Sequence, residues 1–120
     1  LEKQGLDCGG IDIDVNTAPY VDVVNDLNNT HVDVLYMDYK KLPRAAFKEI
    51  DLILGCDICY WEDHIENIVN LTKRAKCPVL IADPGRDTFW ELTKKVKGNL
   101  HDLTLTKPRA VHGYVFEVLP

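Results

Sequence analysis

The fold class follows from the stretch DLILGCD at residues 51–57, an apolar run that ends in an acidic residue. Short runs rich in Leu and Ile are typical of strands that a parallel sheet buries on both faces. A second run of this kind, PVLIAD, occupies residues 78–83. Because an amphipathic segment separates the two runs, the sequence predicts a layered α/β domain in which strands and helices alternate.

The segment between these runs is predicted to form a helix that begins after Trp61. Its first turn is acidic and its last turn is basic, an arrangement that the helix dipole favours. Four residues recur on one face at helical spacing and are expected to face the core: Ile65, Ile68, Val69 and Thr72.

The N-terminal part repeats the alternation. Strands are predicted over residues 8–13 and 32–36. The helix between them starts near Pro19, with Thr17 as a possible cap, and its apolar side carries Val21, Val24 and Leu27. A short helix over residues 43–48 leads into the central run. This order of elements is that of a mostly parallel sheet.

The C-terminal part departs from this pattern. Thr88 and Glu91 are spaced as a capping box, which predicts a helix that Gly98 stops. Leu103 and Leu105 then alternate with polar residues, and a final strand is predicted over residues 113–118. A strand that follows another strand through a turn, without a crossover helix, implies an antiparallel pair.

The composition is that of an ordinary globular protein, with 46% hydrophobic and 28% charged residues. The formal net charge of -5 gives no indication of a nucleic-acid partner. No apolar stretch approaches the about 20 residues that a membrane span requires, and the N-terminus lacks a signal pattern. We therefore expect a cytoplasmic protein without a membrane partner. The chain opens at Leu1 without a methionine, and we expect it to be a fragment.

Acidic residues follow each of the four predicted parallel strands. They are Asp12, Asp38, Asp57 and Asp83. Ligands of such sheets bind at the carboxyl ends of the strands, where loops and helix N-termini converge. Strand-end acids also serve as turn residues and helix caps, so their position alone leaves both roles open.

Four motifs follow one another along the chain: GIDID at 10–14, MDY at 37–39, DLILGCDICY at 51–60 and ADPGR at 82–86. In this order they resemble the motifs of class I S-adenosylmethionine-dependent methyltransferases. The branch that includes many protein methyltransferases is the most similar, because its corresponding strand ends in Asp and is followed shortly by Tyr. The resemblance implies a single, partial methyltransferase domain over residues 1–120. Its fold would be a Rossmann-like three-layer sheet, mostly parallel with an antiparallel C-terminal hairpin strand.

The resemblance also implies which residues contact the cofactor. Asp12 would accept hydrogen bonds from the ribose hydroxyls, and Ile13 would lie against the adenine ring. Asp38 would accept from the adenine amino group with Tyr39 beside it, and Cys56 would also line the cofactor site.

The acceptor side is implied in the same way. Asp57 would be the catalytic residue, nearest to the sulfonium and the incoming nucleophile. Tyr60 and Trp61 would face a cationic methyl group or a substrate amine, although they would equally suit packing under the following helix. Asp83 and Arg86 would contact the substrate, Arg86 by gripping an anionic group. The acceptor itself, a protein side chain or a small molecule, stays open.

Two further interpretations compete with an enzyme. A phospho-accepting receiver domain has a similar length and a late Lys-Pro such as Lys107-Pro108, but its tail is a helix. A noncatalytic binding module of the methyltransferase fold would bind the cofactor without turnover. The Cys56-x-x-Cys59 spacing lacks the second ligand pair that a zinc site needs, and no metal site is predicted.

The methyltransferase pattern begins with a strand and a glycine-rich turn that this sequence lacks, since Gly9 and Gly10 fall within a different strand. The absent strand would lie between those that end at Asp12 and Asp57. We therefore expect the fragment to be inactive alone. The exposed sheet edges would favour a homodimer.

Overall fold

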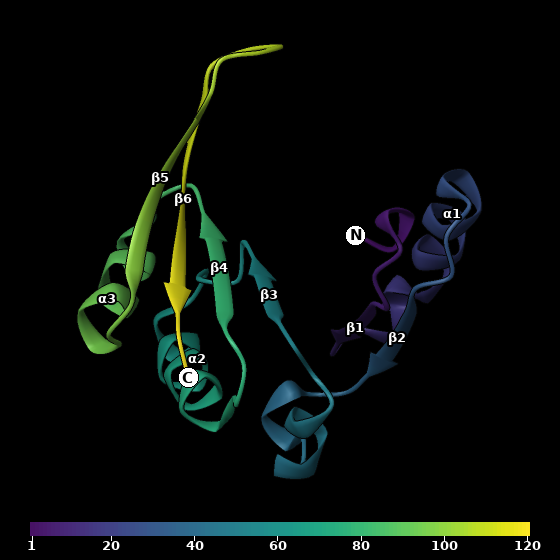
Figure 1. Cartoon of the computed structure of the whole chain (residues 1–120), viewed down its shortest axis with the longest axis horizontal. Coiled ribbons are helices and arrows are strands. Elements are labelled where there is room, and N and C mark those ends of the chain that lie inside the picture. Colours follow the sequence, from purple (N-terminus) through teal and green to yellow (C-terminus); the bar gives the residue numbers. More distant parts are fainter. The chain divides into compact units, whose positions relative to one another are not determined.

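The computed structural model describes all residues from Leu1 to Pro120 and divides them into two compact units, Leu1–Leu42 and Pro43–Pro120. Figure 1 follows the chain through both units. No helix is long and apolar enough to cross a membrane.

The first unit contains a two-stranded parallel sheet. The strands are β1 (Gly9–Asp12) and β2 (Asp33–Tyr36), and α1 (Ala18–Asn28) connects them. Three 3-10 turns complete the unit: Glu2–Gln4, Val15–Thr17 and Tyr39–Lys41. The predicted strands and helix are confirmed here.

The helix α1 has clear end signals, with a proline in its first turn and Asn29 in the left-handed conformation after its last turn. Its apolar side is covered only in part, at the half-buried Val21. Val24 is 56% exposed and Leu27 is 80% exposed, and no residue of this unit is buried. The amphipathic segment is therefore helical, but its apolar side chains do not contribute to a buried core.

The second unit contains a four-stranded sheet in the order β3-β4-β6-β5. Its elements are a 3-10 helix (Arg44–Lys48), β3 (Ile53–Cys56), α2 (Glu62–Arg74), β4 (Val79–Asp83), α3 (Asp87–Lys95), β5 (Asn99–Leu105) and β6 (Val111–Val118). Strands β3 and β4 are parallel, whereas β6 is antiparallel to both β4 and β5. The predicted antiparallel tail is confirmed, and a receiver domain lacks this feature. Figure 1 shows β5 and β6 continuing beyond the other strands as a two-stranded arm.

The core of this unit lies between the sheet and the helices α2 and α3. The predicted face of α2 is buried at all four positions. It packs with two fully buried residues of α3, Phe89 and Leu92, and with the buried positions of β4. Alternate residues of β4 are only half-buried, so the helices cover one face of this strand more than the other.

Three sequence-based expectations were wrong in detail. The run at residues 51–57 is not buried on both faces, because β3 is an edge strand and Leu54 is 46% exposed. Thr88 forms no capping box: its hydroxyl donates to the Cys59 carbonyl oxygen. Gly98 does not stop α3, which ends at Lys95. Instead, a Cβ at Gly98 would lie 2.5 Å from the Glu117 carbonyl oxygen, so glycine permits close strand approach.

Candidate functional site

The first unit holds Asp12 as the last residue of β1, with its carboxylate already oriented. Oδ1 accepts a hydrogen bond from the Asp14 N–H at 2.9 Å, and Oδ2 accepts one from the Thr17 hydroxyl at 3.2 Å. An ionised carboxylate offers about four lone-pair positions. Two bonds therefore fix the group and leave both oxygens able to accept from a ligand.

Asp38 lies two residues beyond β2, at the same edge of this sheet. The Met37 N–H donates to the Asp12 carbonyl oxygen at 2.9 Å and so joins the ends of β1 and β2. The Asp38 carboxylate accepts from the Lys40 N–H at 2.9 Å and pairs with the Lys40 ammonium at 3.2 Å. The backbone hydrogen bond, helped by the lysine charge, lowers the pKa of Asp38 below its ordinary value. Asp38 is thus held as an anionic acceptor.

The other two residues predicted for the adenosine differ in exposure. The Ile13 side chain is 73% exposed directly after Asp12, whereas Tyr39 is half-buried in the 3-10 turn after Asp38. An open cleft of about 560 Å³ lies between α1 and β1, and Asp12 and Thr17 are among its lining residues. Ile13, Asp38 and Tyr39 do not line it, so this cleft and the predicted adenosine contacts share only Asp12.

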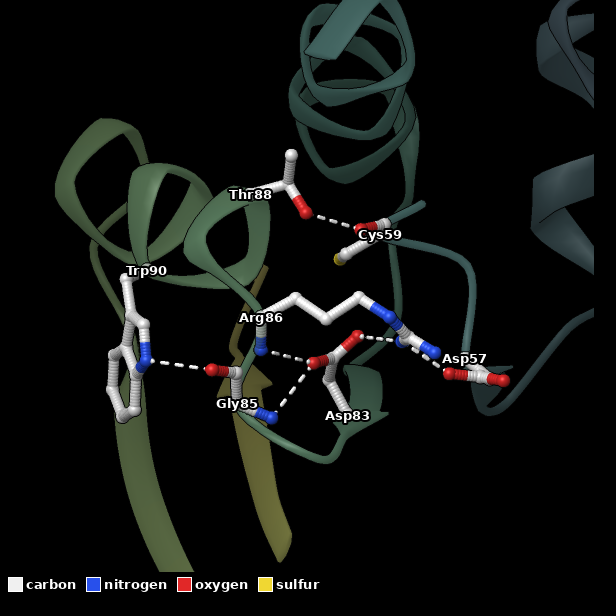
Figure 2. A network of polar contacts seen from close by, with 7 residues as sticks. All are labelled: Asp57, Cys59, Asp83, Gly85, Arg86, Thr88 and Trp90. Carbon is white, nitrogen blue, oxygen red and sulfur yellow. Dashed lines mark hydrogen bonds and ion pairs between the residues drawn. The ribbon is translucent and has the colours of Figure 1, made fainter. Parts of the chain in front are cut away.

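In the second unit the central feature is Arg86, which lies between two carboxylates (Figure 2). One guanidinium nitrogen, Nη1, pairs with Asp83 at 2.8 Å and also with Asp57. The guanidinium carbon lies 4.2 Å from the centre of the Tyr60 ring, a cation–π contact. The neighbouring Asp57 and Asp83 raise the pKa of Arg86 above its already high value. The arginine is therefore a permanent cation shared by two anions.

Asp83 is the buried member of this group, and its side chain has no exposed surface. Its Oδ1 accepts from the N–H groups of Gly85 and Arg86 at 2.8 and 2.9 Å, and its Oδ2 faces the guanidinium. A buried carboxylate is tolerated only when it is paired and hydrogen-bonded. Asp83 meets both conditions through residues of its own turn.

Asp57 directly follows β3 and adopts the left-handed conformation, with φ of 61°. Asp tolerates this region better than most residues because its short side chain bonds locally. The Asp57 N–H donates to the Ala82 carbonyl oxygen at 2.8 Å, which fixes the backbone, while 56% of its side chain remains exposed. The predicted catalytic carboxylate is thus accessible, but it is paired with Arg86.

Tyr60 and Trp61 follow on the same loop. They are 56% and 65% exposed, and their ring centres are 6.1 Å apart. Neither ring packs under α2. Their exposed aromatic surface remains available to a ligand, apart from the Tyr60 contact with Arg86.

The last residue of β3, Cys56, and the loop residue Cys59 have different surroundings. Cys56 is exposed and Cys59 is fully buried, and both are free thiols. Burial, with the nearby Asp83 charge, raises the pKa of the Cys59 thiol to about 11. The thiolate needed for redox exchange or metal binding is therefore disfavoured at this position.

Sequence reasoning missed the residues that orient the carboxylates. Thr17 was expected only as a helix cap, and nothing indicated that Lys40 would hold Asp38. Trp90 was also missed, although its indole N–H donates to the Gly85 carbonyl oxygen at 3.1 Å and steadies the Asp83 turn. The sequence feature that could have indicated Trp90 is its position in the predicted amphipathic helix, directly after the apolar Phe89.

Comparison with known proteins defines the fold. No protein-family model and no curated protein sequence matches the chain. The chain is similar in structure to the PH0226 protein of Pyrococcus horikoshii OT3, with a TM-score of 0.66 and 12% identity over 99% of this chain and 74% of that one. It is also similar to TehB of Haemophilus influenzae, with a TM-score of 0.50 and 14% identity over 96% of this chain and 50% of that one. The chain thus spans half of TehB. These similarities confirm the Rossmann-like methyltransferase fold.

Proposed function

We propose that this chain is the α/β core of an S-adenosylmethionine-dependent methyltransferase of the cytoplasm. The observation that carries the proposal is the pair of oriented carboxylates, Asp12 and Asp38, at the ends of adjacent parallel strands in a methyltransferase-type fold. Ribose hydroxyls and an adenine amino group are donors, and an anionic carboxylate is an acceptor only. The donor set of the cofactor's adenosine therefore fits the residues present.

The second unit would serve the methyl acceptor. The cofactor supplies an activated methyl group, and the protein has to align the nucleophile with it. Asp57 would orient the nucleophile or receive its proton. The exposed rings of Tyr60 and Trp61 would border the acceptor. The acceptor class, a protein side chain or a small molecule, is not distinguished by these residues.

The cofactor assignment is tested by calorimetry with S-adenosylmethionine. Asp12→Ala removes a charge-assisted acceptor and should weaken binding by roughly 1.5 to 3 kcal/mol, about ten- to a hundredfold. Asp14→Ala is the matched control, because Asp14 is a neighbouring carboxylate that caps the Asn16 N–H at 2.9 Å and has no proposed ligand role. Equal affinities of Asp12→Ala and the unmodified protein would exclude the proposed site.

The role of Asp57 is tested separately. In the full-length parent protein, Asp57→Asn should reduce methyl transfer far more than cofactor affinity. A parallel fall in both would place Asp57 in the cofactor site instead.

A noncatalytic binding module is the second candidate, and the pairing of Asp57 with Arg86 favours it. A carboxylate engaged by an arginine is less free to accept a proton from a nucleophile. This candidate predicts cofactor binding by calorimetry without methyl transfer, even when the full-length parent protein is supplied with varied acceptors.

A further inference from the structure

Two loops of the second unit meet at Arg86. The β3–α2 loop comprises residues 57–61, and the β4–α3 loop comprises residues 84–86. We propose that Arg86 is a positioning residue that clamps the β3–α2 loop to the β4–α3 loop and thereby sets the positions of the Asp57 carboxylate and the Tyr60 ring. That these two side chains serve a methyl acceptor rests on the proposed function. The contact between the two loops does not depend on it.

The base of the clamp is rigid. Asp83 is buried and holds both the backbone and the guanidinium of Arg86. On the other side, Gly85 is in the left-handed region with φ of 101°, and a Cβ there would lie 2.8 Å from the Tyr114 ring. Trp90 packs edge-on against Tyr114 with 4.8 Å between ring centres and bonds the Gly85 carbonyl oxygen. The β4–α3 loop is therefore held in place by contacts that do not involve the β3–α2 loop.

The β3–α2 loop receives three contacts from this side of the unit. The Asp57 N–H donates to the Ala82 carbonyl oxygen. The Thr88 hydroxyl donates to the Cys59 carbonyl oxygen, as Figure 2 shows. These two contacts hold backbone. The third, Arg86, holds side chains: it pairs with the Asp57 carboxylate and lies over the Tyr60 ring. The Asp57 carboxylate has no other ion pair or hydrogen bond.

The chemistry of this position calls for arginine. A planar guanidinium can meet two carboxylates and stack on a ring at the same time, whereas an ammonium is a compact point charge. Because its charge is shared between Asp57 and Asp83, Arg86 is assigned here to positioning rather than to binding an anionic group of the substrate.

Hydrogen exchange of the full chain, without substrate or cofactor, tests the clamp. Arg86→Lys keeps a cation beside the buried Asp83, so the unfolding temperature should change little. Amide exchange in residues 57–61 should nevertheless rise about fivefold or more, because a local restraint is lost. Asp57→Asn breaks the same contact from the other loop, leaves Asp83 paired, and should raise the same exchange.

Lys94→Ala is the control, because it breaks a different ion pair of the same unit, the exposed pair with Glu91 within α3. It should leave the exchange of residues 57–61 unchanged. Unchanged exchange in both Arg86→Lys and Asp57→Asn would overturn the clamp. Equal acceleration across the whole unit in Arg86→Lys would also overturn it, since that would indicate a general structural role.

A calorimetric titration with S-adenosylmethionine separates this result from the proposed function. Arg86→Lys should bind the cofactor with the affinity of the unmodified protein. Failure of every variant to bind would contradict the proposed function, while the exchange result would still decide the clamp.

Discussion

The two units of the chain differ in how they bury their apolar side chains. Every buried residue, from Phe47 to Val118, lies in Pro43–Pro120, and the unit Leu1–Leu42 has none. The first unit combines two strands and one helix, and such a small assembly has too little interior to exclude water. The comparison shows that stability and proposed cofactor recognition are divided: the second unit provides the core, and the first unit provides Asp12 and Asp38.

The largest expected effect tests where the core lies. Phe89 is fully buried among the rings of Trp90, Tyr114 and Phe116. Phe89→Ala should lower the free energy of unfolding by about 3 to 5 kcal/mol. Tyr20 in α1 is 73% exposed, and Tyr20→Ala should change it by less than about 0.5 kcal/mol. Urea unfolding measures both, and similar losses would break the comparison between the units.

The buried thiol of Cys59 gives the stability of the second unit a pH dependence. Burial raises the pKa of Cys59 from 9.0 to about 11, so the folded state retains a proton that the unfolded state loses. The resulting stability is present below pH 9 and is lost as the pH rises toward 11. A shift of this size corresponds to roughly 2 to 3 kcal/mol.

The measurement compares slopes rather than absolute stabilities. Cys59→Ala should flatten the decline of unfolding free energy between pH 9 and 11 relative to the unmodified chain. Cys56→Ala removes an exposed thiol and should keep the original slope. Three equal slopes would show that Cys59 is not the group responsible.

Each unit has a strand with an unpaired edge through which two chains could associate. Strand β1 pairs only with β2, and β3 pairs only with β4. Such edges recruit strands. We expect the mass of the 120-residue chain in light scattering to rise with concentration toward twice the monomer mass. Leu54→Lys on β3 should suppress this rise, whereas Leu27→Lys on α1 should not. A concentration-independent monomer would contradict the expectation, and suppression by Leu27→Lys alone would assign the contact to α1.

The sequence predicted burial correctly in the second unit but not in the first. The spacing of Ile65, Ile68 and Val69 predicted the buried face of α2 because the sheet is present to cover it. The equivalent pattern at Val24 and Leu27 predicted a helix but could not predict exposure. Periodicity identifies the side that would be buried, and only the tertiary structure supplies the surface that buries it.

The site was predictable to a similar extent. The acidic residue that follows each apolar run predicted Asp12 and Asp38 at the ends of β1 and β2 in the first unit, and Asp57 and Asp83 at the ends of β3 and β4 in the second. The Arg86 bridge was not predictable, because the left-handed turn at Asp57 and the burial of Asp83 together determine which carboxylates meet the guanidinium. Thr88 was not predictable for the same reason. Its spacing from Glu91 suited a helix cap, but its hydroxyl donates to the carbonyl oxygen of Cys59 in another loop.

The smallest expected effect concerns Asp38, whose carboxylate is held by Lys40, two residues further along the chain. Its pKa is lowered first by the Lys40 N–H and then by the lysine side chain. Lys40→Ala removes the ammonium and keeps the backbone donor, so the pKa of Asp38 should rise only part of the way to its ordinary value of 3.8. Because the folded-state pKa is lowered, the associated stability is present above the ordinary pKa and is lost as the pH falls through the folded-state value. Carboxyl chemical shifts followed by NMR during an acid titration measure this directly. A full return to 3.8 in Lys40→Ala would show that the ammonium, rather than the backbone of the 3-10 turn, holds Asp38 ionised. In that case the orientation of this carboxylate would depend on a mobile surface side chain. The first unit would then lack the preformed adenine contact on which its proposed role depends.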